Sequence, residues 1–168
     1  QDKYRDIAAI GELKTSQIQE WRRKNLADAY RAQVSPFFRQ ALAEWRKSPE
    51  DANLRANWRQ RLQLEQEAYG YADVLLLDLD GRILLAASEN RDPVDAITRQ
   101  AIAAALARGS AVFSDFHRAA DGRVYLDVVV PVSGADGRPL AMLVLRNDAA
   151  TCLYPLIQAW PTPSHSAE

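Results

Sequence analysis

Three Asp-Gly pairs do most to restrict what this chain can fold into. Each pair lies between two runs of apolar residues, and this pattern is a strong signal for a tight β-hairpin turn. The pairs are Asp80-Gly81, Asp121-Gly122 and Asp136-Gly137. Because hairpin turns join antiparallel strands, we predict one five-stranded antiparallel sheet formed by residues 72–87 and 111–146.

The residues before Tyr71 have a helical pattern instead. Residues 2–34 contain no proline, and apolar side chains recur among charged ones at helical spacings, at Ile7, Ile10, Ile18 and Trp21. A helix of this length is roughly 45 Å long, so we expect part of it to project beyond the domain. Further helices are predicted at 37–46, 49–69, 92–108 and 149–158. The predicted fold class is therefore α+β, with the long N-terminal helix and other helices packed on the central sheet.

The length of 168 residues suits one domain with a sizeable core. We predict that residues 1–168 form a single unit, in which helix 1–34 leads into a globular part, 35–158, and a Pro- and Ser-rich tail, 159–168, links to following sequence. The net charge of −1 provides no general attraction for nucleic acid or anionic membranes. There is no run of about 18 apolar residues that would span a membrane.

Side chains alternate between the two faces of a strand, and the last strands have two unlike faces. One face is apolar, with Val124, Leu126, Val128, Val130, Ala141, Leu143 and Leu145, and we expect the long helices to cover it. The other face is mixed, with Phe113, Asp115, His117, Tyr125, Asp127, Val129, Met142, Val144 and Arg146. The turn positions predict that Asp115 lies opposite Tyr125 and that Tyr125 lies near Arg146. A slip of one residue would exchange the faces.

Two interpretations of the polar row on the mixed face remain open. It is either a solvent-exposed sheet surface, in which Asp115 and Arg146 form an exposed pair worth less than about 1 kcal/mol, or the floor of a ligand pocket with a few convergent polar groups. In the second case the helix at 92–108 would form a lid over it. We expect no enzyme activity in this domain, because the sequence has no nucleophile elbow, phosphate-binding glycine loop or metal motif. No cofactor and no metal are predicted.

The order of these elements resembles that of PAS-like Cache (PDC) domains, the extracytoplasmic sensor domains of bacterial membrane receptors. The resemblance rests on the long N-terminal helix, on "ADVLLLDLDGRILLAAS" as the first β-hairpin, and on "GRVYLDVVVPVSGADGRPLAMLVLRNDA" as the last two strands. It implies a periplasmic ligand-sensing domain of an inner-membrane protein, with a transmembrane segment preceding residue 1. A sensor histidine kinase is the first expectation; a diguanylate cyclase or chemoreceptor is the alternative.

The family binds small ligands on one face of its sheet, which favours the pocket interpretation. The residues then expected to bind the ligand are Asp115, His117, Tyr125, Asp127 and Arg146. The expected ligand is a small molecule such as a carboxylate or amino acid, since arginine and histidine suit an anion. The resemblance also implies a homodimer in the full-length receptor and signalling through the N-terminal helix. A dimerisation or spacer module without its own ligand remains the alternative.

Overall fold

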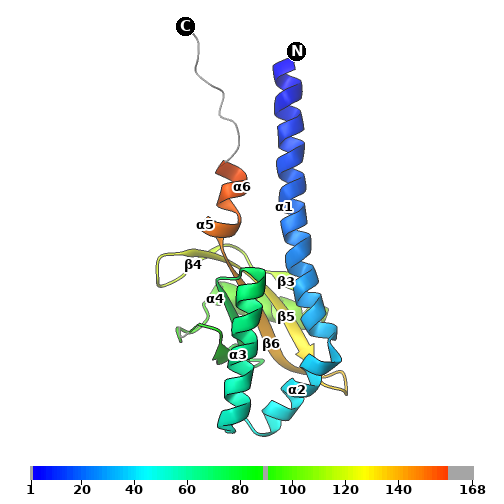
Figure 1. Cartoon of the computed structure of the whole chain (residues 1–168), viewed down its shortest axis with the longest axis vertical. Coiled ribbons are helices and arrows are strands. Elements are labelled where there is room, and N and C mark those ends of the chain that lie inside the picture. The colour runs from blue at the N-terminus through cyan, green and yellow to red at the C-terminus, as the bar shows by residue number, and fades with distance from the viewer. Residues whose placement is uncertain (1, 89–90, 159–168) are drawn as a thin grey trace.

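The structure is a computed structural model that describes residues 2–88 and 91–158. The described elements, in chain order, are α1 (Asp2–Val34), α2 (Pro36–Lys47), α3 (Ala52–Tyr69), β1 (Asp73–Leu77), β2 (Ile83–Ala86), α4 (Ala96–Arg108), β3 (Val112–Phe113), β4 (His117–Arg118), β5 (Val124–Ser133), β6 (Pro139–Asp148), α5 (Ala149–Cys152) and α6 (Tyr154–Gln158). In Figure 1 the first half of α1 projects beyond the sheet, and α6 lies toward the same end of the molecule. The α+β fold class and the projecting helix are confirmed. The predicted tail at 159–168 lies outside the described residues.

The helix boundaries follow local signals in the sequence. Ser35 caps α2, because its Oγ accepts a hydrogen bond from the backbone N–H of Phe38 at 3.3 Å. Gly70 ends α3 in the left-handed conformation, with φ at +74°. The first three helices therefore end within about two residues of the predicted boundaries. The helix predicted at 92–108 begins later, at Ala96, because Asp95 is its N-cap residue.

The helix predicted at 149–158 is divided into α5 and α6, which meet at Leu153. Pro155 gives the physical reason. Its nitrogen carries no hydrogen, so it cannot donate to the carbonyl of Thr151, and its ring would clash with that carbonyl in a continuous helix. A proline at this position therefore stops the helix that begins at Ala149 and starts a new turn.

The sheet is antiparallel, with the strand order β2-β1-β6-β5-β3, and β4 also pairs with β5. The five-strand arrangement is thus confirmed, with the strand predicted at 111–117 divided between β3 and β4. In the centre of the sheet Arg146 lies opposite Asp127 of β5 on one side and opposite Asp73 of β1 on the other. Tyr125 lies opposite Asp148, two residues from the predicted partner, and an even shift leaves the faces unchanged.

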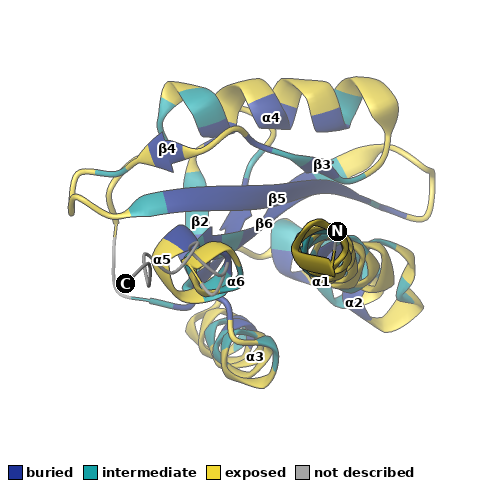
Figure 2. Ribbon diagram, turned by 90° about the horizontal axis from the view of Figure 1, so that it is seen from above, coloured by how far each residue is buried: buried dark blue, intermediate teal, exposed yellow. Residues whose placement is uncertain are grey.

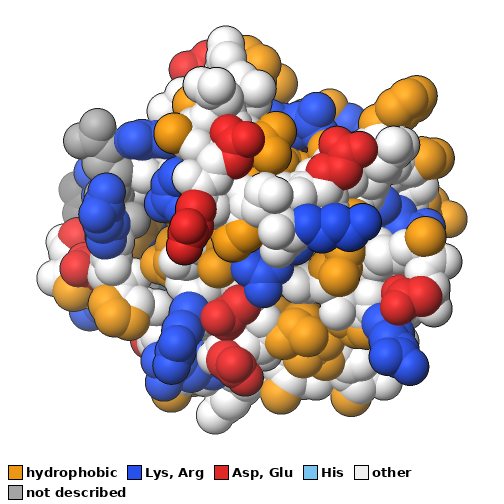
Figure 3. All heavy atoms as spheres, turned by 90° about the horizontal axis from the view of Figure 1, so that it is seen from below, with side chains coloured by type: hydrophobic (Ala, Val, Ile, Leu, Met, Phe, Trp, Pro, Cys, Tyr) orange, Lys and Arg blue, Asp and Glu red, His pale blue; other side chains and the backbone are white. Residues whose placement is uncertain are grey.

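Helices cover both faces of the sheet, as Figure 2 shows: α4 lies on one face and α1, α2 and α3 lie on the other. The helices α1–α3 bury the apolar face predicted for them, including Val128, Val130 and Leu143. The helix α4 packs on Val129, Met142 and Val144 of the mixed face. At the end of the molecule away from the N-terminus of α1, basic, acidic and hydrophobic side chains are interspersed (Figure 3), in keeping with the small net charge.

The break between β3 and β4 changes which residues share a face. Phe113 lies opposite Val128 and His117 lies opposite Tyr125. His117 is four residues after Phe113, whereas Tyr125 is only three residues before Val128, so the segment between β3 and β4 contains one extra residue. The extra residue reverses the side-chain alternation before the break. The prediction that Asp115 lies opposite Tyr125 is therefore wrong, and Phe113 packs on the α1 side of the sheet.

Candidate functional site

The centre of the candidate site is the carboxylate of Asp127, which is completely buried under α4. Its Oδ1 accepts a hydrogen bond from Arg146 Nε at 2.9 Å, and its Oδ2 accepts one from Arg146 Nη2 at 3.1 Å. Thr98 Oγ1 also donates to Oδ2, at 2.8 Å. Arginine is suited to this contact because its planar group presents two donors to one carboxylate. A buried charge is tolerated when it is paired and hydrogen-bonded in this way.

His117 lies between two carboxylates. Its Nδ1 is 2.6 Å from Asp95 Oδ2 and its Nε2 is 3.0 Å from Asp127 Oδ2. Burial acts to lower the pKa of His117, but the hydrogen bonds and charges of Asp127 and Asp95 outweigh it and raise that pKa above its usual value. The imidazolium form can donate to both carboxylates at once. The raised pKa therefore favours the protonated form of His117.

Both carboxylates that contact His117 favour their ionised forms. Burial acts to raise the pKa of Asp127, but hydrogen bonds from His117 and Arg146 outweigh it and lower that pKa below its usual value. The pKa of Asp95 is also lowered, because the backbone N–H of Thr98 and the His117 charge outweigh the effect of burial. The site therefore holds charges of both signs.

Tyr125 forms one side of the cluster. The guanidinium carbon of Arg146 lies 5.1 Å from the centre of its ring, which is within range of a cation–π contact. The phenol donates a hydrogen bond to Asp121 Oδ2 at 2.7 Å. Burial and this hydrogen bond raise the pKa of Tyr125 to about 12. The ring is therefore uncharged at neutral pH and helps to orient the guanidinium.

A second buried carboxylate, that of Asp73, approaches Arg146 from β1. It accepts a hydrogen bond from the backbone N–H of Ser88 at 3.0 Å and another from the Ser88 hydroxyl. Asp73 lies opposite Arg146 in the β1–β6 pairing, and its charge acts on the guanidinium. The cluster thus contains three acidic groups, one arginine and one histidine.

Four of the five residues expected at the ligand site come together: His117, Tyr125, Asp127 and Arg146. Asp115 does not join them, because it lies in the break between β3 and β4, outside the strand pairing. It is exposed and lines a groove of about 480 Å³ with Trp21.

Asp73, Asp95 and Thr98 also belong to the cluster and were not predicted. Two signals were available for them. Asp95 and Thr98 form an N-cap pair in "DAIT". Asp73 is an acid at the start of an otherwise apolar strand.

In the part of the chain that the structure describes, no group of three or more His, Cys, Asp or Glu side chains is placed to hold a metal ion. None of the helices at 2–88 and 91–158 is both long enough and apolar enough to cross a bilayer.

Comparison with known proteins gives a likeness in structure. No protein-family model matches the chain, and no curated protein sequence is significantly similar to it. The sensor domain of the V. cholerae histidine kinase DctB superposes with a TM-score of 0.74 and 17% identity, over 95% of this chain and 60% of that one.

Two further solved structures have the same fold. The ligand-binding domain of the Pseudomonas aeruginosa amino acid chemoreceptor PctC, in complex with GABA, has a TM-score of 0.66 and 20% identity, over 93% of this chain and 68% of that one. The E. coli DcuS sensor domain has a TM-score of 0.59 and 14% identity, over 85% of this chain and 98% of that one. The chain thus spans 60% of the DctB structure and nearly all of the DcuS domain. It has the fold of the PAS-like Cache (PDC) sensor domains, and the predicted resemblance is confirmed at the level of fold.

Proposed function

We propose that the chain is an extracytoplasmic sensor domain of a bacterial membrane receptor, and that it binds a small amino acid-like molecule at the Asp127 cluster. The observation that carries the proposal is the buried group of opposite charges between the sheet and α4. Such charges are costly to bury, and replacing them by apolar residues is often neutral or stabilising. A binding function explains their presence at one point of an otherwise apolar interface.

The geometry favours a ligand with both an ammonium and a carboxylate group. In the structure Asp127 and Arg146 are hydrogen-bonded to each other. A ligand that binds to either of them therefore has to replace its present partner. A simple carboxylate that took Arg146 would leave Asp127 without its main partner, at a high cost in free energy. A zwitterion offers its ammonium group to Asp127 and its carboxylate to Arg146, so both charges stay paired. A small amino acid therefore fits better than a simple carboxylate.

A short path connects this site with α1. Arg146 faces the cluster, and the next residue, Asn147, faces the opposite side of the sheet because side chains alternate along a strand. Asn147 Nδ2 donates to Asn25 Oδ1 on α1 at 2.8 Å, and both side chains are buried. A partner exchange at Arg146 would shift β6 and thus the contact with α1. A ligand biases such a shift only through its different affinities for the two states.

The full-length receptor would be a homodimer with parallel α1 helices. On the projecting half of α1, Tyr4, Ile7 and Leu13 have exposed fractions of 81%, 50% and 57%. A second copy would bury part of this apolar surface. Trp21, in contrast, packs on Phe113 of its own domain with 5.9 Å between the ring centroids, so it is not available to a partner. A sensor histidine kinase remains the first expectation for the whole protein, with a diguanylate cyclase or chemoreceptor as the alternative.

The test is a thermal-shift screen of small amino acids, amines and carboxylates against the chain and its Asp127→Asn variant. A true ligand at 100 times its dissociation constant stabilises the fold by about 2.7 kcal/mol. We expect an amino acid to stabilise the natural chain and to have no effect on Asp127→Asn. The matched control is Asp136→Asn, in the exposed β5–β6 turn, which should respond like the natural chain.

One observation favours the alternative of a spacer without a ligand. All the charged groups of the cluster already have partners, so the cluster can serve as a fixed link between α4 and the sheet. If no compound of the screen stabilises the chain, the spacer function is supported and the sensor proposal fails.

A further inference from the structure

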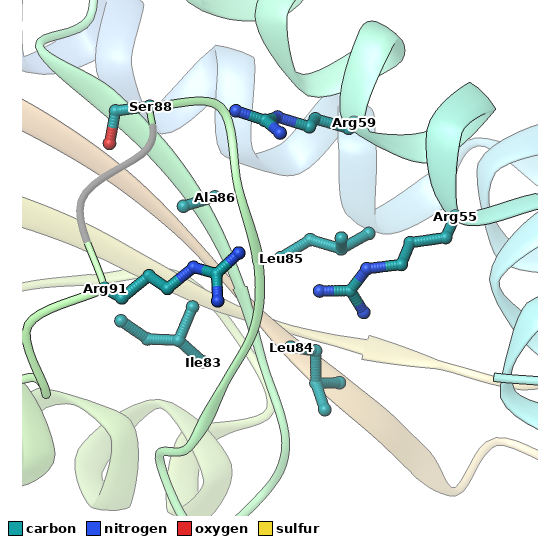
Figure 4. A pocket seen from close by; sticks show the side chains of 8 residues that line it. All are labelled: Arg55, Arg59, Ile83, Leu84, Leu85, Ala86, Ser88 and Arg91. Atoms are coloured by element: carbon teal, nitrogen blue, oxygen red, sulfur yellow. The ribbon is translucent and has the colours of Figure 1, made fainter. Parts of the chain in front are cut away.

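A cavity lies at the edge of the sheet, beside β2. It has a volume of about 490 Å³, which is within the range of small-ligand sites. All four residues of β2 line it, together with three arginines: Arg55 and Arg59 from α3, and Arg91 from the segment before α4. Figure 4 shows these side chains around the cavity.

The arginines come from two separate elements that approach the cavity from different directions. Arg55 and Arg59 are four residues apart on α3, so they lie on the same face of that helix, one turn from each other. In Figure 4 the guanidinium groups of Arg55 and Arg91 both extend toward Leu85. Like charges repel, so this convergence favours an anionic ligand over an empty cavity.

Arg55 and Arg91 have no acidic partner among the residues that the structure describes. Within residues 2–88 and 91–158, neither side chain forms an ion pair or a side-chain hydrogen bond. Arg146, by comparison, is bound to Asp127 on two atoms. Both unpaired arginines are exposed, so a ligand can reach them from solvent. The net charge of the whole chain is −1, so these arginines are not part of a general excess of basic residues.

The floor of the cavity adds a further feature of an anion site. The strand β2 is at the end of the sheet order and pairs with β1 alone among the described strands. The backbone groups on its outer edge therefore have no strand partner there, and N–H groups at a sheet edge can donate to an anion. The Leu85 side chain is almost fully buried and closes the floor.

We propose that this cavity binds a small anion that carries two or more carboxylate or phosphate groups. One anionic group would be held by Arg55, with Arg59 one helix turn away, and the other by Arg91. Arginine is suited to both kinds of group because its fork of donors binds either in a bidentate manner. The cavity adjoins the Asp127 cluster, because Ser88 lines it and donates to Asp73, but the proposal does not depend on the function proposed for that cluster.

Isothermal titration calorimetry of the 168-residue chain tests the proposal with three probes. Citrate represents polycarboxylates, pyrophosphate represents phosphates, and acetate at equal ionic strength is the monovalent control. We expect saturable binding of citrate or pyrophosphate, weakened by added salt, and none of acetate. Whichever of the two binds identifies the source of the anionic groups.

Variants then locate the site. Loss of one charge-assisted contact weakens binding about 10- to 150-fold, or about 1.5–3 kcal/mol at 1.4 kcal/mol per tenfold. We expect this loss in Arg55→Gln and in Arg91→Gln. The matched control is Arg138→Gln, which removes one exposed arginine from the β5–β6 turn and should leave binding unchanged. Urea midpoints confirm that each variant is folded.

Three results would overturn the proposal: no binding of either multivalent probe, equal binding of acetate, or unchanged affinity in the Arg55→Gln/Arg91→Gln double variant. The Arg146→Met variant separates the two proposals, because Arg146 is the arginine that would hold an anion at the Asp127 cluster. Anion binding that survives in Arg146→Met supports the β2 site even where the amino acid screen fails. Anion binding that is lost in this variant, with the fold intact, places the anion at the Asp127 cluster and refutes a site at β2.

Discussion

Replacing Arg146 by methionine tests whether the Asp127 cluster holds the fold together. The variant keeps a side chain of similar length and leaves the Asp127 carboxylate buried without its main partner. The Asp127 side chain is fully buried and that of Arg146 is 13% exposed, so solvent screens the pair little. Removing one partner of a buried ion pair costs about 3–5 kcal/mol. Because His117 and Thr98 still contact the carboxylate, we expect the lower end, about 3 kcal/mol.

The assay is urea unfolding of the natural chain, of Arg146→Met, of Asp127→Leu and of the double variant at neutral pH. We expect each single variant to be destabilised and the double variant to recover much of the loss, since two apolar residues can replace a buried pair. The control is Arg123→Gln, which breaks a 3.7 Å pair between Asp148 and an arginine whose side chain is 66% exposed. That change should cost less than about 1 kcal/mol. An equally small loss in Arg146→Met would refute the reasoning.

Three further predictions follow from the same geometry. The pKa of His117 is higher in the folded state than in the unfolded state. The stabilisation by protonated His117 is therefore complete below about pH 6.5 and is lost as the pH rises through the folded-state pKa. The urea midpoint of the natural chain should fall over this pH range, and that of His117→Gln should fall less. Asn147→Leu removes the donor to the buried Asn25 Oδ1, while Asn25 Nδ2 still donates to the Trp21 carbonyl; the change should cost about 1–3 kcal/mol, whereas the double change to leucine should cost less. Cysteines placed at Ile10 or Lys14 in the full-length receptor should cross-link the two α1 helices. If these two positions give no cross-links while other positions give efficient ones, the parallel dimer is contradicted.

The cluster shows which parts of a site can be recognised from one sequence. His117, Tyr125, Asp127 and Arg146 were predictable together because turn positions and the two-residue repeat of strands place them on one face. Their pairing was not predictable. The register is two residues from the prediction, so Arg146 lies opposite Asp127, and the two groups bind each other. Asp95 and Thr98 reach the site from α4, whose position on the sheet depends on tertiary packing.

The sequence by itself determined the antiparallel sheet, the long first helix and the apolar face that the helices cover. These features depend on local signals, such as Asp-Gly turns, caps and the spacing of apolar residues, and such signals act between neighbours in the chain. Tertiary structure decided the position of Asp115, because one extra residue between β3 and β4 exchanges the faces. It also decided that Arg55 and Arg91 line one cavity, since residues on separate elements meet only when the whole core has assembled.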